Sequence, residues 1–273
     1  MPTPSSRRAF VIAAPAAALG AGALLRPRAV RADTPAPPSP AHDAFPRQDP
    51  DLVRQAVGWS HGNIDGLREL LADQPELAKA SWDWGFGDWE TCLGAASHTG
   101  RVEIAELLLE HGARPTLFSA AMLGQLDVVR AFVEAQPGVQ RLAGPHGISL
   151  LRHAQAGRER AARVLAYLES LGDAEPDLGE QPLSTADRDR LVGEYAWADD
   201  DRSRCAVEIR REMLFFTPAD APARGLIHHG DLAFSPAGAP SVRIVFTAPP
   251  DGPAASVRIT GSGADLVAKR IVG

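Results

Sequence analysis

The stretch ETCLGAASHTGRVEIAELLLEHGA, from Glu90 to Ala113, predicts two short helices joined by a glycine turn. The hydroxyl of Thr91 is suited to accept a backbone N–H at the start of the first helix. Gly100 supplies the turn, because glycine adopts left-handed backbone conformations at little cost. The second helix carries an apolar stripe of Ile104, Leu107 and Leu108. The stretch therefore predicts one helix-turn-helix unit.

This unit resembles a repeat of the ankyrin family. Residues 91–96, TCLGAA, stand where the family has Thr-Pro-Leu-His-x-Ala, with Cys92 in place of proline and Gly94 in place of histidine. The resemblance implies a scaffold for binding and not a particular chemistry. Ankyrin arrays recognise their partners through side chains that differ from one protein to the next.

Similar helix-turn-helix patterns recur over residues 51–172, with glycine turns at Gly62, Gly100, Gly124 and Gly157. The recurrence predicts an N-terminal α-solenoid of about four ankyrin-like repeats, and about three are needed for a stable stack. Gly100 and Gly124 lie closer together than the ankyrin period of about 33 residues. We therefore expect the hairpin finger before the third unit to be largely missing.

Residues 186–273 follow a different pattern, after a linker at 173–185 that is rich in acidic residues and proline. Short alternating runs are separated by Gly, Pro and Asp, and these predict strands at 205–209, 213–217, 225–229, 232–235, 242–247, 256–260 and 266–271. The fold class is thus multidomain α plus β, with the solenoid followed by a small antiparallel β-barrel or sandwich.

The second region also carries a resemblance. The motif LVGEY at 191–195 opens a meander, Val245 and Phe246 lie in a late strand, and AKRI at 268–271 forms the last strand. These features look like the lipocalin-like barrel appended to many exported bacterial hydrolases. There the barrel is an accessory module without known catalytic residues, so the resemblance implies a fold and no activity.

Residues 1–32 predict a signal for export across a bacterial inner membrane. SRRAFV at 6–11 precedes an uncharged Ala/Gly/Leu run, which resembles the twin-arginine type that carries folded proteins. A membrane anchor is the alternative, but the run is too short and too weakly apolar to span about 30 Å of hydrocarbon. Cleavage after Ala32 leaves a proline-rich, disordered linker at 33–50. The mature protein is expected to be periplasmic or secreted.

The charge balance bears on the class of partner. The chain holds 28 Lys and Arg against 34 Asp and Glu. The charged residues within 1–32 are five arginines, so loss of this segment makes the protein more acidic. We expect no nucleic-acid partner, because phosphates require a basic face, and no membrane association after signal cleavage. The expected partner is a protein or a small ligand. Cys92 and Cys205 are expected to be core residues and not redox groups.

The segment WDWGFGDWE, from Trp82 to Glu90, concentrates three of the five tryptophans beside three acidic residues. It falls where an ankyrin array projects a hairpin finger. One interpretation is a binding platform for a sugar ring, a cationic ligand or a partner's basic loop. The other is packing, with Trp82 and Trp89 filling the gap left by the irregular third unit. The candidate binding residues are Trp82, Asp83, Trp84, Phe86, Asp88, Trp89, Glu90 and His98.

The sequence offers weaker candidates for catalysis and metal binding than for a binding surface. The histidines that recur beside the glycine turns are His61, His98, His111, His146 and His153. No pair shows the i, i+4 spacing with a flanking Glu of a helical zinc site, so we expect no metal and no cofactor. Among them His98, near Asp88 and Glu90, is the best candidate ligand. Ser119 and Ser149 are expected to cap helices.

These patterns favour an exported, non-enzymatic binding protein that uses its ankyrin-like array as a recognition surface. One alternative is a periplasmic enzyme or enzyme subunit with a pocket near residues 82–98. Its polar groups would be Asp83, Asp88, Glu90 and His98. Another alternative is an architectural part of an envelope complex.

Overall fold

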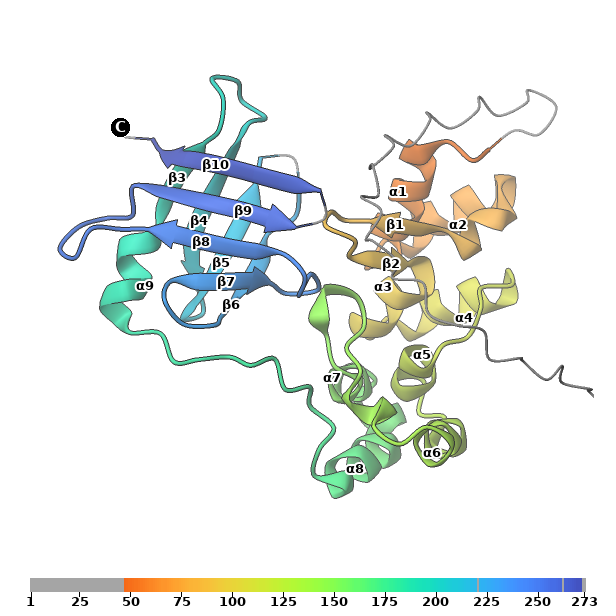
Figure 1. Ribbon diagram of the computed structural model, residues 1–273. Coiled ribbons are helices and arrows are strands. Elements are labelled where there is room, and N and C mark those ends of the chain that lie inside the picture. Colours follow the sequence, from red (N-terminus) through yellow and green to blue (C-terminus); the bar gives the residue numbers. More distant parts are fainter. Residues whose placement is uncertain (1–46, 220, 262, 272–273) are drawn as a thin grey trace, which may run out of the picture. The chain divides into compact units, whose positions relative to one another are not determined.

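The computed structural model describes residues 47–219, 221–261 and 263–271 (Figure 1). The expected export signal at 1–32 and residues 33–46 of the expected linker lie outside the described residues. Among the residues that are described, none of the helices combines the length and the apolar character needed to cross a membrane.

Consecutive helix pairs make up the first part of the described chain (Figure 1). Within residues 47–172 the pairs are α1 (Pro50–Trp59) with α2 (Ile64–Asp73), α3 (Cys92–His98) with α4 (Val102–Glu110), α5 (Leu117–Met122) with α6 (Leu126–Ala135), and α7 (Leu150–Ala156) with α8 (Ala162–Leu171). The two helices of each pair contact each other, and α1 also packs against α3, α3 against α5, and α5 against α7. The first helices therefore form one continuous row.

Hydroxyl side chains fix the starts of several of these helices, largely as the sequence predicts. The Thr91 hydroxyl accepts the backbone N–H of Gly94 at 2.9 Å, and the Ser149 hydroxyl accepts that of Arg152 at 3.2 Å. Ser119 differs from the expectation, since it lies one turn inside α5. Thr116 is the N-cap there, and Ser119 completes a capping box with it.

The segments between the pairs differ in a way that decides where the site lies. A two-stranded hairpin of β1 (Ser81–Asp83) and β2 (Trp89–Thr91) precedes α3. Residues 111–116, between α4 and α5, contain no strand, which confirms that the third unit lacks a finger. Short 3-10 helices at Pro75–Lys79, Val139–Arg141, Pro145–Gly147 and Arg158–Ala161 fill the other connections.

The apolar core of the helical part lies between neighbouring pairs. Leu67, Leu71, Leu93 and Leu108 are fully or almost fully buried between the first two pairs. Cys92 is buried in the same cluster, and Cys205 is buried in the barrel. Both thiols are free, and burial raises their pKa to about 11 and about 12 respectively. The expectation that both cysteines are core residues is confirmed.

The second part of the described chain is a closed antiparallel barrel, which settles the choice between barrel and sandwich. After α9 (Thr185–Leu191), the eight strands described are β3 (Gly193–Ala196), β4 (Arg204–Arg210), β5 (Met213–Pro218), β6 (Arg224–His228), β7 (Ala233–Pro236), β8 (Arg243–Thr247), β9 (Ser256–Gly261) and β10 (Ala264–Arg270). Consecutive strands pair, and β10 closes the barrel on β3 through Arg270 and Tyr195. Side chains that include Tyr195, Phe216 and Phe234 fill the interior.

Replacing Tyr195 with phenylalanine is expected to destabilise the protein by about 1–2 kcal/mol. The buried Tyr195 hydroxyl donates to the Leu191 carbonyl at 2.6 Å and accepts from Arg270 Nη2 at 3.0 Å. Its removal takes this donor from the Leu191 carbonyl and one of two acceptors from Arg270 Nη2, which keeps its bond to the Arg190 carbonyl. Urea unfolding of the full chain measures the loss. Tyr167→Phe is the matched control, because this ring keeps its contact with Arg130. A loss as large in the control would contradict the role given to the Tyr195 hydroxyl.

Candidate functional site

The strands of the hairpin β1–β2 place neighbouring residues of the tryptophan-rich segment on opposite faces. Its register pairs Trp82 with Glu90 and Asp83 with Trp89. Successive side chains of a strand point to opposite faces, so Trp89 and Glu90 of β2 lie on opposite faces of the hairpin. Glu90 has an exposed fraction of 0%, whereas Trp89 is 62% exposed. The strand thus turns a carboxylate inward and an indole outward.

The turn of the hairpin is held in an unusual conformation. Gly85, Phe86 and Gly87 all have positive φ, and the Asp83 carboxylate accepts the backbone N–H of Gly85 at 2.8 Å and that of Gly87 at 3.1 Å. Phe86 packs against the apolar cluster of the barrel. Asp83 is therefore a residue that shapes the turn, and the tip is anchored by Phe86.

The three tryptophans have different surroundings. Trp82 and Trp84 are partly buried against the core of the first two helix pairs, whereas Trp89 lies on the outward face of β2. The interpretation that Trp89 packs into the gap left by the third unit is wrong, because the inward position of this strand is taken by Glu90. Trp82 is partly buried, and it packs against the core of the first two helix pairs.

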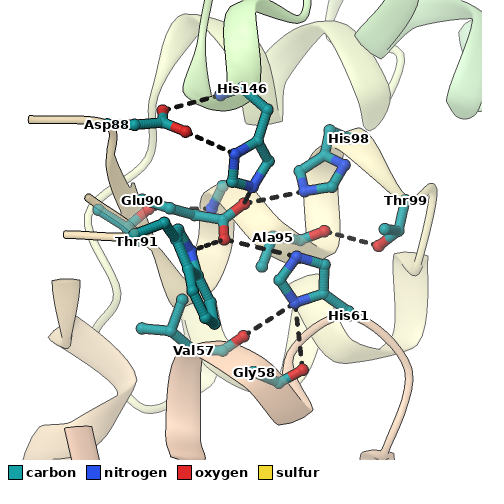
Figure 2. A network of polar contacts seen from close by, with 12 residues as sticks. Val57, Gly58, His61, Asp88, Glu90, Thr91, Ala95, His98, Thr99 and His146 are labelled. Carbon is teal, nitrogen blue, oxygen red and sulfur yellow. Dashed lines mark hydrogen bonds and ion pairs between the residues drawn. The ribbon is translucent and has the colours of Figure 1, made fainter. Parts of the chain in front are cut away.

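Glu90 lies at the centre of a polar network in which three imidazole rings converge on its carboxylate (Figure 2). His98 Nε2 is 2.8 Å from Glu90 Oε1, and His146 Nε2 is 3.4 Å from the same oxygen. His61 Nε2 is 3.4 Å from Oε2, which also accepts the Trp84 indole N–H at 2.7 Å. The network draws on the turn after α1, on β2, on the end of α3 and on the turn at residues 145–147.

Asp88 forms the second carboxylate centre of this network. Its Oδ1 accepts the backbone N–H of His146 at 2.9 Å, and its Oδ2 lies 2.7 Å from His146 Nδ1. Oδ2 also accepts from Arg224 Nη1 at 2.9 Å, and Arg224 Nη2 donates to the Trp84 carbonyl at 2.9 Å. Asp88 and Arg224 are only 3% and 6% exposed, so this is a buried ion pair.

The pKa values follow from burial and from these contacts. Burial opposes ionisation of Glu90, but its interactions with His146 and His98 outweigh burial and lower its pKa to about 2. Burial likewise opposes protonation of His146, yet Asp88 and Glu90 raise its pKa to about 9. The pKa of Asp88 is also lowered, since His146 and Arg224 outweigh its burial. His146 thus lies between the two carboxylates, and Arg224 is the second cationic partner of Asp88.

Sequence reasoning found part of this site. Of the eight candidate residues, Trp84, Asp88, Glu90 and His98 join the network, while Trp82, Asp83, Phe86 and Trp89 lie outside it. His61, His146 and Arg224 were not singled out as members of one site. The only sequence signal for the two histidines is their recurrence beside glycine turns, and Arg224 carries none.

Two surface cavities border these residues. One of about 670 Å³ is lined by His98, Ser149, Arg152, Gln155, Glu175 and Leu178, among others. Another of about 310 Å³ is lined by Arg54, Trp82, Asp83 and Trp84 with residues 85, 221 and 222. His98 therefore connects the buried network to a cavity of a size that accepts a small solute.

Comparison with known proteins bears on the helical part. No curated protein matches the chain. Residues 88–119 match the family described as Ankyrin repeat, and this segment runs from the end of the hairpin through α3 and α4 into α5. It includes the TCLGAA motif that carries the resemblance. The chain thus contains an ankyrin repeat at residues 88–119, beside its closed eight-stranded barrel.

Proposed function

We propose that this protein is a non-enzymatic interaction protein whose helical repeats present the hairpin β1–β2 to a protein partner. The observation that carries the proposal is Trp89, a large aromatic side chain that is 62% exposed on a strand whose other face is fixed by Glu90. Tryptophan is among the residues that most often dominate the energy of protein interfaces. A rigid backbone adds to affinity, because little conformational entropy is lost on binding.

The ankyrin repeat at 88–119 supports a protein partner, since repeats of this kind suggest a role in protein interaction. We extend the assignment to an array of about four ankyrin-like repeats over residues 51–172, on the basis of the four helix pairs described there. The eight-stranded barrel at 186–273 would be a lipocalin-like accessory module. No nucleic-acid partner is proposed, because the chain is acidic overall.

We also propose that the protein is exported from the bacterial cytoplasm. The arginine pair at 7–8 and the uncharged run that follows support export through a bacterial inner membrane, with a periplasmic or secreted product. The proline-rich segment expected at 33–50, whose last residue Pro50 begins α1, would then be a linker between the cleavage site and the first helix pair.

Trp89→Ala is expected to weaken partner binding by about 30-fold or more, because a tryptophan at the centre of an interface contributes about 2 kcal/mol or more. Chemical crosslinking with the wild-type full chain, which keeps the Trp89 indole, would capture the partner from the exported fraction, and binding of the purified pair would then be measured. Trp84 must stay intact, because its indole N–H donates to Glu90.

Phe132→Ala is the matched control, since Phe132 is also an exposed aromatic residue but lies on α6. Melting curves verify that both variants fold. The proposal fails if wild type and Trp89→Ala bind the captured protein equally well, or if Phe132→Ala weakens binding as strongly.

A second candidate function is an enzyme or enzyme subunit, and the cavity of about 670 Å³ beside His98 is the observation that favours it. Asp83 is then excluded from the catalytic groups, because its carboxylate is engaged in the hairpin turn. If the wild-type protein recovers no partner, the enzyme becomes the better supported function. Its polar groups would be Asp88, Glu90 and His98.

A further inference from the structure

The ring nitrogens of three histidines are spaced around Glu90 like the ligands of one ion. One ligand atom from each of His61, Glu90, His98 and His146 can be chosen so that all four lie within 4.8 Å of one another. Figure 2 shows the three rings directed at the Glu90 carboxylate from different sides. Ligand atoms of a tetrahedral ion with bonds of about 2.0–2.2 Å are about 3.3–3.6 Å apart. Binding would therefore bring the most widely separated ligand atoms closer together and move His98 Nε2 away from Glu90 Oε1, from which it is now 2.8 Å distant.

The separation between His146 and the Glu90 carboxylate fits coordination better than hydrogen bonding. Protein hydrogen bonds from nitrogen to oxygen have typical lengths of about 2.7–3.2 Å. His146 Nε2 lies 3.4 Å from Glu90 Oε1, which is long for a hydrogen bond but normal for two ligands of one ion. His61 Nε2 lies 3.4 Å from Oε2, the other oxygen of the same carboxylate. Only His98, at 2.8 Å, lies at hydrogen-bond distance.

The second nitrogen of two of these rings is already engaged. His61 Nδ1 lies 3.2 Å from the Val57 carbonyl and 3.1 Å from that of Gly58, so Nδ1 carries the proton and donates it. His146 Nδ1 faces the Asp88 carboxylate at 2.7 Å. In both rings Nε2 is left facing Glu90. Histidine ligands of metals have this arrangement, in which a carbonyl or carboxylate orients the ring and increases its basicity.

The fourth donor, Glu90, is positioned by groups outside the cluster. Trp84 Nε1 donates to its Oε2, which leaves Oε1, between His98 and His146, as the oxygen suited to coordinate. The Glu90 side chain is fully buried, and that of His98 is 10% exposed. A buried anion of this kind favours a cation beside it.

The backbone at His146 gives an independent sign of a constrained position. His146 has φ +60°, within the left-handed region that residues other than glycine rarely adopt. Such strain persists only where the surroundings hold it, often at functional sites. Here the backbone N–H and the ring of His146 both contact Asp88, which is itself held by Arg224.

We propose that His61, His98, His146 and Glu90 form a binding site for one divalent transition-metal ion, with Zn²⁺ as the first candidate. Three imidazoles and a carboxylate are donors suited to Zn²⁺, Cu²⁺, Fe²⁺ or Ni²⁺, and not to Mg²⁺ or Ca²⁺. With four protein ligands the site is of the structural type. The ion joins the turn after α1, the hairpin, the end of α3 and the turn at 145–147, and so fixes the base of the hairpin.

The test uses the untagged full chain, because a polyhistidine tag would itself bind the ion. The chain is stripped with a chelator and titrated with Zn²⁺ by calorimetry, and Co²⁺ serves as a spectroscopic substitute whose visible absorption reports tetrahedral geometry. We expect one equivalent bound, and a melting temperature that rises with Zn²⁺ concentration. Partner binding plays no part in this readout, so the test is independent of the function proposed above.

Variants decide whether the ion occupies this cluster. His61→Ala is expected to lower the affinity at least about 100-fold, since the loss of an orienting group alone costs about 10–100-fold. His61 is partly exposed at a turn, so this variant should fold, and its melting in chelator verifies that. Asp88→Asn, which replaces the carboxylate that orients His146 and pairs with Arg224, is expected to lower the affinity about 10–100-fold, and its melting in chelator is measured in the same way.

His111→Ala is the matched control. His111 also follows a helix and contacts a carbonyl four residues earlier, that of Leu107 at 2.9 Å, but it lies outside the cluster. It should bind one equivalent with unchanged affinity. The proposal is overturned if the wild-type chain binds no Zn²⁺ or Co²⁺, or if His61→Ala and His111→Ala bind equally. The cluster would then be an ion-pair network that needs no metal.

Discussion

Replacing Arg224 with alanine is expected to lower the free energy of unfolding by about 3 kcal/mol. Arg224 and Asp88 form a buried pair at 2.9 Å, and the guanidinium also donates to the Trp84 carbonyl. Its removal leaves the Asp88 carboxylate buried with His146 as its remaining charged partner. An uncompensated buried charge is costly, because the protein interior screens and solvates it far less than water does.

Arg258→Ala is the matched control for this prediction. Arg258 also lies on a barrel strand and forms a bidentate pair with Asp265, but both side chains are more than half exposed. Exposed pairs contribute little to stability, because water and salt screen them. Urea unfolding in the presence of a chelator measures both variants without any contribution from bound metal. Equal losses in the two variants would show that the Arg224–Asp88 pair contributes no more than a surface pair.

Gly124→Ala is expected to destabilise the protein by about 3 kcal/mol or more. Gly124 has φ +75°, which is strained for any other residue, and a Cβ at this position would lie 2.1 Å from the Arg160 carbonyl oxygen. The contact is with backbone, so it cannot be relieved by a side-chain rotation. The turn between α5 and α6 would have to separate from the 3-10 helix Arg158–Ala161.

Gly58→Ala is expected to stabilise the protein, and urea unfolding measures both glycine variants. Gly58 lies within α1, and a Cβ there meets no atom within 4 Å. Alanine in a helix is more stable than glycine by about 0.5–1 kcal/mol, so this variant should unfold at a higher denaturant concentration. A Gly124→Ala variant as stable as wild type would mean that the turn is not packed as closely as described.

Part of the fold could be predicted from local sequence signals. Thr91 and Ser149 start helices as expected, because a cap depends on hydrogen bonds within one turn. Seven of the eight barrel strands described overlap the predicted alternating runs, since a period of two is a local property, whereas β3 was not among those runs. Ser119 was misplaced by one turn because Thr116 and Ser119 are both competent caps, and only the backbone path decides between them.

The candidate site was only half predictable. The segment 82–98 supplied Trp84, Asp88, Glu90 and His98, because an excess of aromatic and acidic residues is visible in one short window. The outward position of Trp89 was not predicted. It depends on which face of β2 meets the neighbouring helices, and alternation by itself specifies two faces without saying which is inward.

The sequence alone thus determined the helix pairs, the glycine turns between them, the ankyrin repeat and the strand pattern, because each follows from interactions among residues close along the chain. Only the tertiary structure decided that the sheet closes through β10 and β3, and that His61, Glu90, His98 and His146 meet. These contacts join residues far apart in sequence. Periodicity gives the face on which a side chain lies, but the packing of one unit on the next decides which faces converge.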